Sequence, residues 1–470
     1  MKLKAISSQA IRMFTFCIFL PVLLLIPVAH ADTANTINLS QAVDMALKYD
    51  FQVATAQSNL QKTKLALKQE VIKIYPQASV ENTLKYDLNN NKFPDDFTVT
   101  IKETYPTKYN LYGEKIPTSV EAAVWDQLSI ESQLQITQAN VVYNTVTLYI
   151  NALKAKQSIP LLELTVKNSQ AALTLAQAQL KLGQITKPTE LKAANDLANA
   201  NFNLEKGRSD YNMALRQLGN QLGIKDPSGL ELAELPENMT ATRESAQSID
   251  WEQLKTEALQ KRLELKQAQI TIQKAERQLA QMQNQALPDL NISFNSGSMD
   301  QTWSCSIGYS FLNGNINGNA RKTFTNSGSP ITNNFALKFT WNGDFGTADN
   351  QIEQAKLGLD NATNSEKQTL QMIEWDLEQA RANYELAQEK LKNNEQMIPF
   401  YQKQLEIKRL QYQQGSVTQL DVANNEAALI QAQLQAAGSK YDLVSAYEKL
   451  QLVSGALYQL EDPEKNQSGK

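Results

Sequence analysis

The sequence predicts a mainly α-helical protein with a small β part, built from two similar halves of long antiparallel helices. Three observations predict this class: an internal repeat, two helical patterns of about 65 residues each, and short alternating segments at matching points of both halves. At 1.5 Å per residue such helices span about 100 Å. That length is too great for one ordinary globular domain.

The first 31 residues have the pattern of a secretory signal peptide. Three basic residues precede an apolar run at 14–28, and Ala29-His30-Ala31 fits a small-x-small cleavage site. The run is short for a membrane-spanning helix, which needs about 20 apolar residues. We therefore expect cleavage after Ala31.

The composition of the remaining chain excludes several classes of function. Removing three basic residues of the 45 leaves 42 against 49 acidic residues, a formal charge of −7, which argues against a nucleic-acid partner. The sole histidine, His30, lies in the signal peptide, so histidine triads and histidine metal sites are excluded. Carboxylate catalysis stays formally open, but no acid pair at strand ends suggests it. We predict no enzyme, no metal and no cofactor.

The two halves align without a gap near their starts. Residues 37–76 and 249–288 match at an offset of 212, with eleven of forty positions identical and a shared final proline. Glutamine-rich helices can match by composition alone, but the ungapped register favours duplication. We expect repeats at 32–226 and 249–460, a linker at 227–248 and a polar tail at 461–470.

Strand candidates follow the proline in each half. The alternating segments are 77–87 and 97–105 in the first half and 289–296 and 334–341 in the second, with 302–311 as a further candidate. Asn- and Gly-rich stretches separate them, as turns require. The second half holds about 20 extra residues, and we predict that 313–333 form a loop insertion between strands.

Each half then continues into a very long helix and a return helix. The long helices are expected at 118–182 and 347–413, and the second shows a heptad seam at Leu370, Ile373, Leu377, Ala380, Tyr384, Ala387 and Leu391. Pro160 and Pro399 are expected to interrupt them. Gly183 and Gly415 end the long helices, because glycine relieves a left-handed helix cap.

The strand count predicts an assembly. Four strands per chain cannot close a barrel, since the smallest membrane barrels have eight, and open edges cannot face lipid. Three chains would give a twelve-stranded barrel, with the helices lining a hollow cylinder that continues from it. The alternative is that the strands are soluble.

At this point the sequence resembles the outer-membrane efflux proteins, the TolC-like channels. The resemblance spans nearly the whole mature chain and is carried by residues 39–47, residues 286–290 and, most specifically, residues 412–424 (YQQGSVTQLDVAN). It implies a trimer in the cell outer membrane that extends into the periplasm as a helical tunnel. It further implies docking on a periplasmic adaptor and an inner-membrane pump of RND, ABC or MFS type.

The resemblance also implies a site. In such channels the glycine turns form the periplasmic entrance, and acidic residues after each glycine constrict it. Asp421 holds that place in the second repeat and Glu190 in the first, where the turn contains Pro188 and is expected to be one residue longer. Asn424 stands at a further acidic position, one turn on. Acidic rings favour cations, but both acids also suit ordinary helix N-termini.

A second function explains part of the pattern. A periplasmic coiled-coil structural or adaptor protein would account for the heptads and the glutamine content, but it leaves the strands without a role.

Overall fold

The computed structural model describes residues 35–83, 97–106, 118–227, 229–235, 249–287, 289–299, 303–312, 315–324, 330–340 and 347–459. The expected signal peptide, most of the expected linker, the shared proline Pro288 and the polar tail lie outside the described residues.

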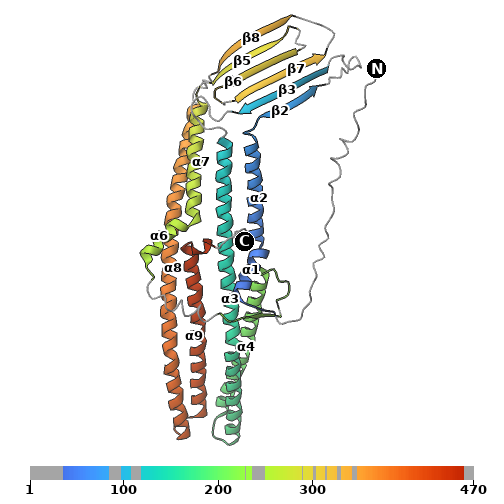
Figure 1. Ribbon diagram of the computed structural model, residues 1–470. Coiled ribbons are helices and arrows are strands. Elements are labelled where there is room, and N and C mark those ends of the chain that lie inside the picture. Colours follow the sequence, from blue (N-terminus) through green and yellow to red (C-terminus); the bar gives the residue numbers. More distant parts are fainter. Residues whose placement is uncertain are drawn as a thin grey trace, which may run out of the picture.

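Both halves of the chain follow one order of elements (Figure 1). The first half comprises α1 (Leu39–Tyr49), α2 (Phe51–Ile72), β2 (Gln77–Thr83), β3 (Phe97–Pro106), α3 (Thr118–Lys181) and α4 (Lys187–Gln221). The second comprises α6 (Trp251–Lys261), α7 (Leu263–Gln285), β5 (Asp289–Ser298), β6 (Trp303–Ser310), β7 (Asn315–Phe324), β8 (Ile331–Thr340), α8 (Thr347–Gln413) and α9 (Gln419–Val453), followed by the short helix η1 (Ala456–Gln459). Elements α1 and α6 start 212 residues apart, the offset of the sequence repeat.

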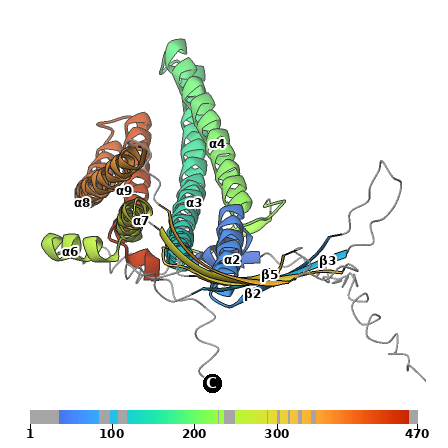
Figure 2. The ribbon, with the colours of Figure 1, turned by 90° about the horizontal axis from the view of Figure 1, so that it is seen from above.

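The long helices form two antiparallel hairpins that lie side by side. α3 packs on α4, α8 packs on α9, and α3 also contacts α9 (Figures 1 and 2). The shorter α2 and α7 flank α3 and α8 nearer the sheet. The sheet therefore stands at one end of the molecule and the two helical turns at the other.

The predicted heptad seam of α8 is confirmed. Six of its seven positions are buried, from Ile373 to Leu391, and Leu370 is half-buried. The predicted interruptions are wrong, because α3 continues through Pro160 and α8 through Pro399. Each proline removes one hydrogen bond of the helix ladder, and packing along the partner helix outweighs that local loss.

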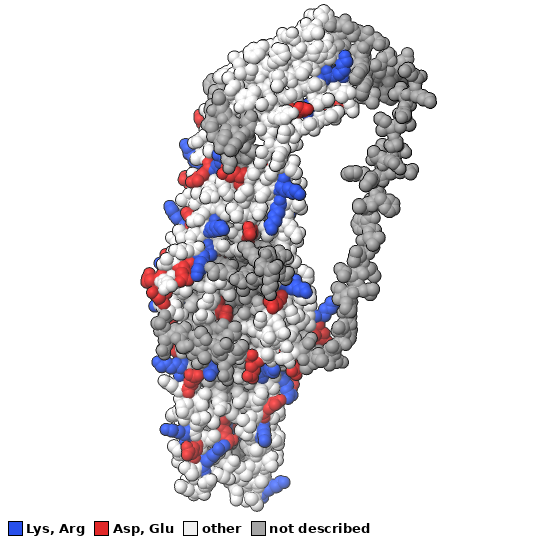
Figure 3. All heavy atoms as spheres, in the orientation of Figure 1, with Lys and Arg blue, Asp and Glu red and all other residues white. Residues whose placement is uncertain are grey.

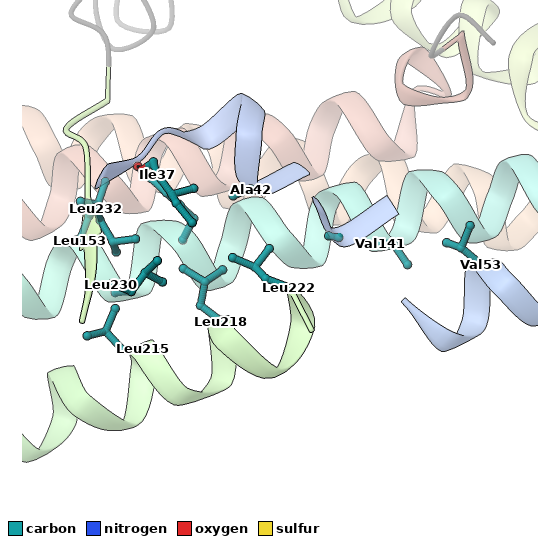
Figure 4. Close-up of a cluster of buried hydrophobic side chains, with 13 residues drawn as sticks. Ile37, Ala42, Val53, Val141, Leu153, Leu215, Leu218, Leu222, Leu230 and Leu232 are labelled. Atoms are coloured by element: carbon teal, nitrogen blue, oxygen red, sulfur yellow. The ribbon is translucent and has the colours of Figure 1, made fainter. Parts of the chain in front are cut away.

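The largest buried cluster lies around the middle of the first half. β1 (Asn35–Ile37) pairs in parallel with β4 (Leu230–Leu232), so part of the expected linker is a strand. Figure 4 shows side chains of these strands meeting those of α3 and α4, among them Leu153 and Leu218. The cluster fixes the start of the first half against the end of that same half.

Within the part of the chain that the structure describes, the sheet has six strands, in the order β2-β3-β7-β6-β5-β8, and each neighbouring pair is antiparallel. The prediction of four strands per chain is therefore wrong, as is the prediction that residues 313–333 form a loop. Residues 315–324 form β7, a strand rich in asparagine. Their composition suggested a turn, but backbone pairing with β3 and β6 overrides the weak strand preference of asparagine.

The strand registers give the sheet two contrasting faces. One, the apolar face, carries Val80, Val99, Ile101, Tyr105, Leu290, Ile292, Phe294, Trp303, Cys305, Ile307, Tyr309, Ile316, Ala320, Ile331, Phe335, Leu337 and Phe339. The other, the polar face, carries mainly Ser, Thr and Asn, as in Ser304, Ser306, Asn317 and Asn319. Glu103 and Lys322 are the charged residues of the apolar face within the described strands.

Among the described residues, none of the helices combines the length and apolar character needed to cross a membrane.

Candidate functional site

The two helical turns at the far end from the sheet have the same backbone geometry. Gly183 has φ +68° and Gly415 has φ +72°, in the left-handed region that other residues adopt at a cost. The amide of Gln184 donates to the carbonyl of Gln179, and that of Ser416 to the carbonyl of Gln411, each at 2.9 Å. These bonds satisfy the last carbonyls of α3 and α8 and turn the chain back sharply.

A threonine begins each return helix. Thr186 is the N-cap of α4 and Thr418 is the N-cap of α9, and each stands three residues after its glycine. The two turns are therefore equally long, and the expectation of a longer first turn is wrong. Pro188 lies in the first turn of α4, where a missing amide hydrogen costs no helical bond.

Equal turn lengths change which residues correspond. The third helical position holds Thr189 in α4 and Asp421 in α9, so Thr189, and not Glu190, is the counterpart of Asp421. Glu190 corresponds to Val422, and both are buried in the helical body. Matching the two acids in sequence had suggested a false insertion.

Asp421 completes a capping box at the start of α9. Its carboxylate accepts hydrogen bonds from the backbone amide of Thr418 at 2.8 Å and from the Thr418 hydroxyl at 2.7 Å. These two bonds, the hydroxyl first, lower the pKa of Asp421, and the nearby charge of Lys408 adds to the effect. The side chain thus acts as a helix-capping acid that stays ionised, whatever else it does.

Glu190 is a different kind of acid. Its side chain is only 11% exposed, and it pairs with Lys187, one turn earlier on α4. A paired carboxylate facing the helical body presents little net charge to the solvent at the turn.

The start of α9 lies against the first hairpin. One groove is lined by Thr418 and Gln419 together with residues of α3 and α4, including Thr189. A second, directly beside it, is lined by Asn424 together with Asn168, Ser169 and further residues of α3 and α4. The two turns are therefore neighbours in space, although 232 residues separate their glycines.

Lys192 and Asp196 line both grooves, and no sequence pattern had singled them out. When the two turns are aligned by the offset of 232 between their glycines, Lys192 corresponds to Asn424. This alignment would have identified Lys192 from the sequence. The grooves between the start of α9 and the first hairpin are therefore lined by one lysine and one aspartate. The local charge is mixed.

A charge brace holds the two hairpins together nearer the middle of the helices. The carboxylate of Asp442 in α9 binds Lys154 of α3 at 2.6 Å and Lys390 of α8 at 2.8 Å. Burial of Asp442 opposes its ionisation, but the bonds from both lysines outweigh it and leave the pKa below its ordinary value. One side chain thus links three helices from both halves.

Comparison with known proteins shows which proteins resemble this chain in sequence and in fold. Residues 254–456 match the family model "Outer membrane efflux protein", which covers the second half from α6 to η1. No curated protein matches the chain.

Several solved structures of outer-membrane channels share the fold. The Campylobacter jejuni CmeC channel superposes with a TM-score of 0.68 at 15% identity, covering 92% of this chain and 88% of that one. Vibrio cholerae VceC gives 0.67 at 16% identity, with 89% and 96% covered. The open state of Neisseria gonorrhoeae MtrE gives 0.68 at 15% identity, with 89% and 88% covered.

Proposed function

We propose that this chain, an outer-membrane efflux protein by the sequence of its second half and by its fold, is the exit duct of an export system in the cell outer membrane. The resemblance drawn from the sequence and the mainly helical channel fold are confirmed by the family match and the solved channels. That family is one of efflux proteins and not of enzymes.

The observation that carries the proposal is the contrast between the two faces of the sheet. Large apolar side chains such as Phe335, Leu337 and Phe339 are each more than 60% exposed on the apolar face. The described helices make no extensive contact with the sheet, so nothing within the described chain covers that face. Hydrocarbon is the partner that suits a continuous apolar face backed by a polar one.

The strand lengths agree with this placement. β3, β5, β7 and β8 each have 10 residues, and a tilted membrane strand needs about 9–11. On the face seen in Figure 3 the sheet bears only isolated charges, whereas the helices carry both signs throughout. The sheet thus suits lipid and the helical body suits water.

The assembly of the duct is part of the proposal. Among the described strands the sheet ends in two unpaired edges, β2 and β8, which a lipid environment does not tolerate. We expect three copies to close the wall, with α3, α4, α8 and α9 of each lining a tunnel about 100 Å long. A periplasmic adaptor and an inner-membrane pump, of RND, ABC or MFS type, would supply the cargo at the helical end.

We propose that the gate lies at the two turns. Asp421 would constrict the entrance, with Asn424 one helical turn further on and Gly183 and Gly415 at the tips. Glu190 contributes less, since it is paired and mostly buried. Lys192 would moderate the ring, because three lysines one helical turn beyond three aspartates weaken its preference for cations.

Membrane fractionation combined with heat-modified mobility tests the proposal. We expect the mature chain in outer-membrane fractions as a species of about three chain masses that separates into monomers on heating. In planar bilayers the purified protein should form ion-conducting pores. A soluble periplasmic monomer without conductance would instead support the coiled-coil adaptor function and overturn the duct.

A further inference from the structure

We propose that the β6–β7 hairpin widens the membrane wall, so that three copies of this chain enclose eighteen strands, with β8 of each copy paired to β2 of the next. This inference rests on the proposed function, because it needs the chain to associate with copies of itself.

The hairpin occupies a place in the sheet that differs from its place in the chain. β6 and β7 come between β5 and β8 in sequence, yet β5 and β8 pair directly with each other. In space the hairpin lies on the far side of β5, between β5 and β3. It has therefore been added within the wall, and not on the rim as an external loop.

The four strands other than β6 and β7 could form a sheet by themselves. Without β6 and β7, the strand β5 would run straight into β8, and the freed edge of β5 would face β3. β3 and β5 run in opposite directions, so they could pair as antiparallel neighbours. The remaining order β2-β3-β5-β8 is a complete four-stranded sheet, two strands from each half of the chain.

The hairpin has the same two faces as the strands around it. Ile307 of β6 is 55% exposed and Ile316 of β7 is 38% exposed, both on the apolar face. Serine alternates with them on β6 and asparagine on β7, facing the other way. A hairpin outside the membrane would have no need of an apolar face aligned with that of β5 and β8.

The edges of the sheet fit a second copy of the chain. β2, β7 and β5 run one way and β3, β6 and β8 the other, because every neighbouring pair is antiparallel. β8 of one copy therefore meets β2 of the next in antiparallel order, with the apolar faces on the same side. Val80 on β2 is 64% exposed and Phe335 on β8 is 70% exposed, so the apolar face extends to both edges and would continue onto the next copy.

Strand number sets the width of the duct. Three copies of a six-stranded sheet give eighteen strands in place of twelve. Barrel diameter grows roughly in proportion to strand number, so the wall would be about one and a half times as wide, in the range that leaves an aqueous channel. The polar face would line it mainly with Ser, Thr and Asn, together with charged residues such as Lys102, Arg321 and Lys338, which suits a water-filled channel.

Paired cysteines on the apolar face test the position of each strand. All variants carry Cys305→Ser, so that a short bis-maleimide cross-linker, which alkylates thiols, acts only at the introduced sites in membranes. Ile101→Cys with Ala320→Cys joins β3 to β7, whose residues are direct partners. Ile101→Cys with Ile307→Cys is the matched control, since β7 lies between those strands. We expect cross-linking within the chain for the first pair and little for the second.

A second set of pairs tests closure between copies. Val80→Cys is combined in turn with cysteine at Ile331, Phe335 or Phe339, three apolar-face positions along β8. We expect at least one combination to link chains into dimers and trimers. If chains are linked to one another but residues 101 and 320 are not linked within a chain, the widened wall is overturned and the proposed duct stands. If residues 101 and 320 are linked but no chains are linked to one another, the closed assembly itself is overturned.

Deletion of residues 303–324 tests the width. If the variant assembles, the largest polyethylene glycol that reduces its current from the barrel side should have a hydrodynamic radius about one and a half times smaller than for the full chain. Equal polymer exclusion in two assembled channels would overturn the proposal. If the deletion fails to assemble, the cross-linking result alone decides.

Discussion

Thr189 and Asp421 occupy the same position in the two tip turns, three residues after the threonine that begins each return helix. One half of the chain thus places a hydroxyl where the other places a carboxylate. In a trimer this arrangement gives three aspartates at that level, with Lys192 and Asn424 at the level one helical turn further on. The entrance is therefore expected to be weakly selective for cations, and a single residue, Asp421, should account for that selectivity.

Two substitutions at Asp421 separate its charge from its capping role. Asp421→Asn removes the charge but keeps an oxygen that can accept from Thr418, whereas Asp421→Ala removes both. We expect both variants to raise single-channel conductance and weaken block by divalent cations. Asp421→Ala alone should also loosen the start of α9, seen as faster proteolysis at the turn.

Thr189→Ala is the matched control for the Asp421 variants, because it alters the corresponding position of the first turn without changing charge. It should leave divalent block unchanged. If both Asp421 variants conduct and bind cations like the parent channel, the gate does not include this residue.

The charge of Asp421 should persist well into the acid range. Hydrogen bonds from Thr418 lower the pKa of Asp421, so its carboxylate stays ionised down to a pH below the ordinary pKa of aspartate. Its negative charge is lost only as pH falls through the lowered pKa. With about 3.9 as the ordinary value for aspartate, divalent block should be constant between pH 8 and pH 5 and should weaken only below about pH 3.9. Bilayer recordings across this range check the expectation. A midpoint between pH 5 and pH 7 would assign the block to another group.

The glycines at the two tips should be required for their left-handed backbone conformation, and not because a side chain would clash with neighbouring atoms. A methyl group added at Gly183 or Gly415 meets no atom of the described residues within 4 Å, but both glycines have positive φ. Alanine there should cost about 1–2 kcal/mol per turn. Gly358→Ala, inside α8 and equally open, should instead stabilise by about 0.5–1 kcal/mol. Denaturant unfolding of the detergent-solubilised protein compares the three alanine variants. Equal changes of the same sign in the free energy of unfolding would contradict the turn geometry.

Helical periodicity made the helices predictable. The apolar spacing from Leu370 to Leu391 reports directly which side of α8 is buried, and the glycines mark where α3 and α8 end. The expected ends at 182 and 413 agree with the observed ends at Lys181 and Gln413 to within one residue. Such local signals survive because a long helix is stabilised along its own length by a regular seam.

The sheet and the site were harder to predict because their determinants are not local. The strand β7 reads NINGNARKTF, which has the composition of a turn, and only its partners β3 and β6 fix it as a strand. At the turns, a search for acids paired Glu190 with Asp421, whereas the threonine caps pair Thr189 with Asp421. The position of Lys192 in the grooves between the two hairpins follows from the packing of two turns that are distant in the sequence.

The brace at Asp442 should stabilise the contact between the two hairpins. Asp442→Asn leaves Lys154 and Lys390 near each other without the carboxylate between them, so we expect a loss of about 1 kcal/mol, limited by partial exposure. Because the pKa of Asp442 is lowered in the folded chain, this stabilisation is present above about pH 4 and is lost as pH falls further.

Glu395→Gln provides the control for the brace, since the Glu395–Lys440 pair is longer, at 3.6 Å, and about half exposed at both ends. It should change stability by less than half as much. Denaturant midpoints at pH 7 and pH 3.5 make the comparison. The brace has no energetic role if Asp442→Asn matches Glu395→Gln at pH 7.

The hydroxyl of Tyr149 should stabilise the β1–β4 pair at the middle of the molecule. The side chain is fully buried, and its oxygen lies 2.9 Å from the carbonyl of Ile37 and 2.6 Å from that of Ala233. Burial raises the pKa of Tyr149 to about 12, so the hydroxyl keeps the proton that it donates. Tyr149→Phe leaves these carbonyls short of a donor and should destabilise the chain by about 1–2 kcal/mol.

Tyr143→Phe is the appropriate comparison for Tyr149→Phe, because it removes a hydroxyl from the same helix while keeping the half-buried ring that Lys449 lies over. Hydrogen exchange of the Ala233 amide, which itself donates to Ile37, should accelerate in Tyr149→Phe and stay unchanged in Tyr143→Phe. This local readout separates loss of the strand pair from a general loss of stability. Equal exchange in both variants would mean that the apolar cluster, and not the hydroxyl, holds the two strands together.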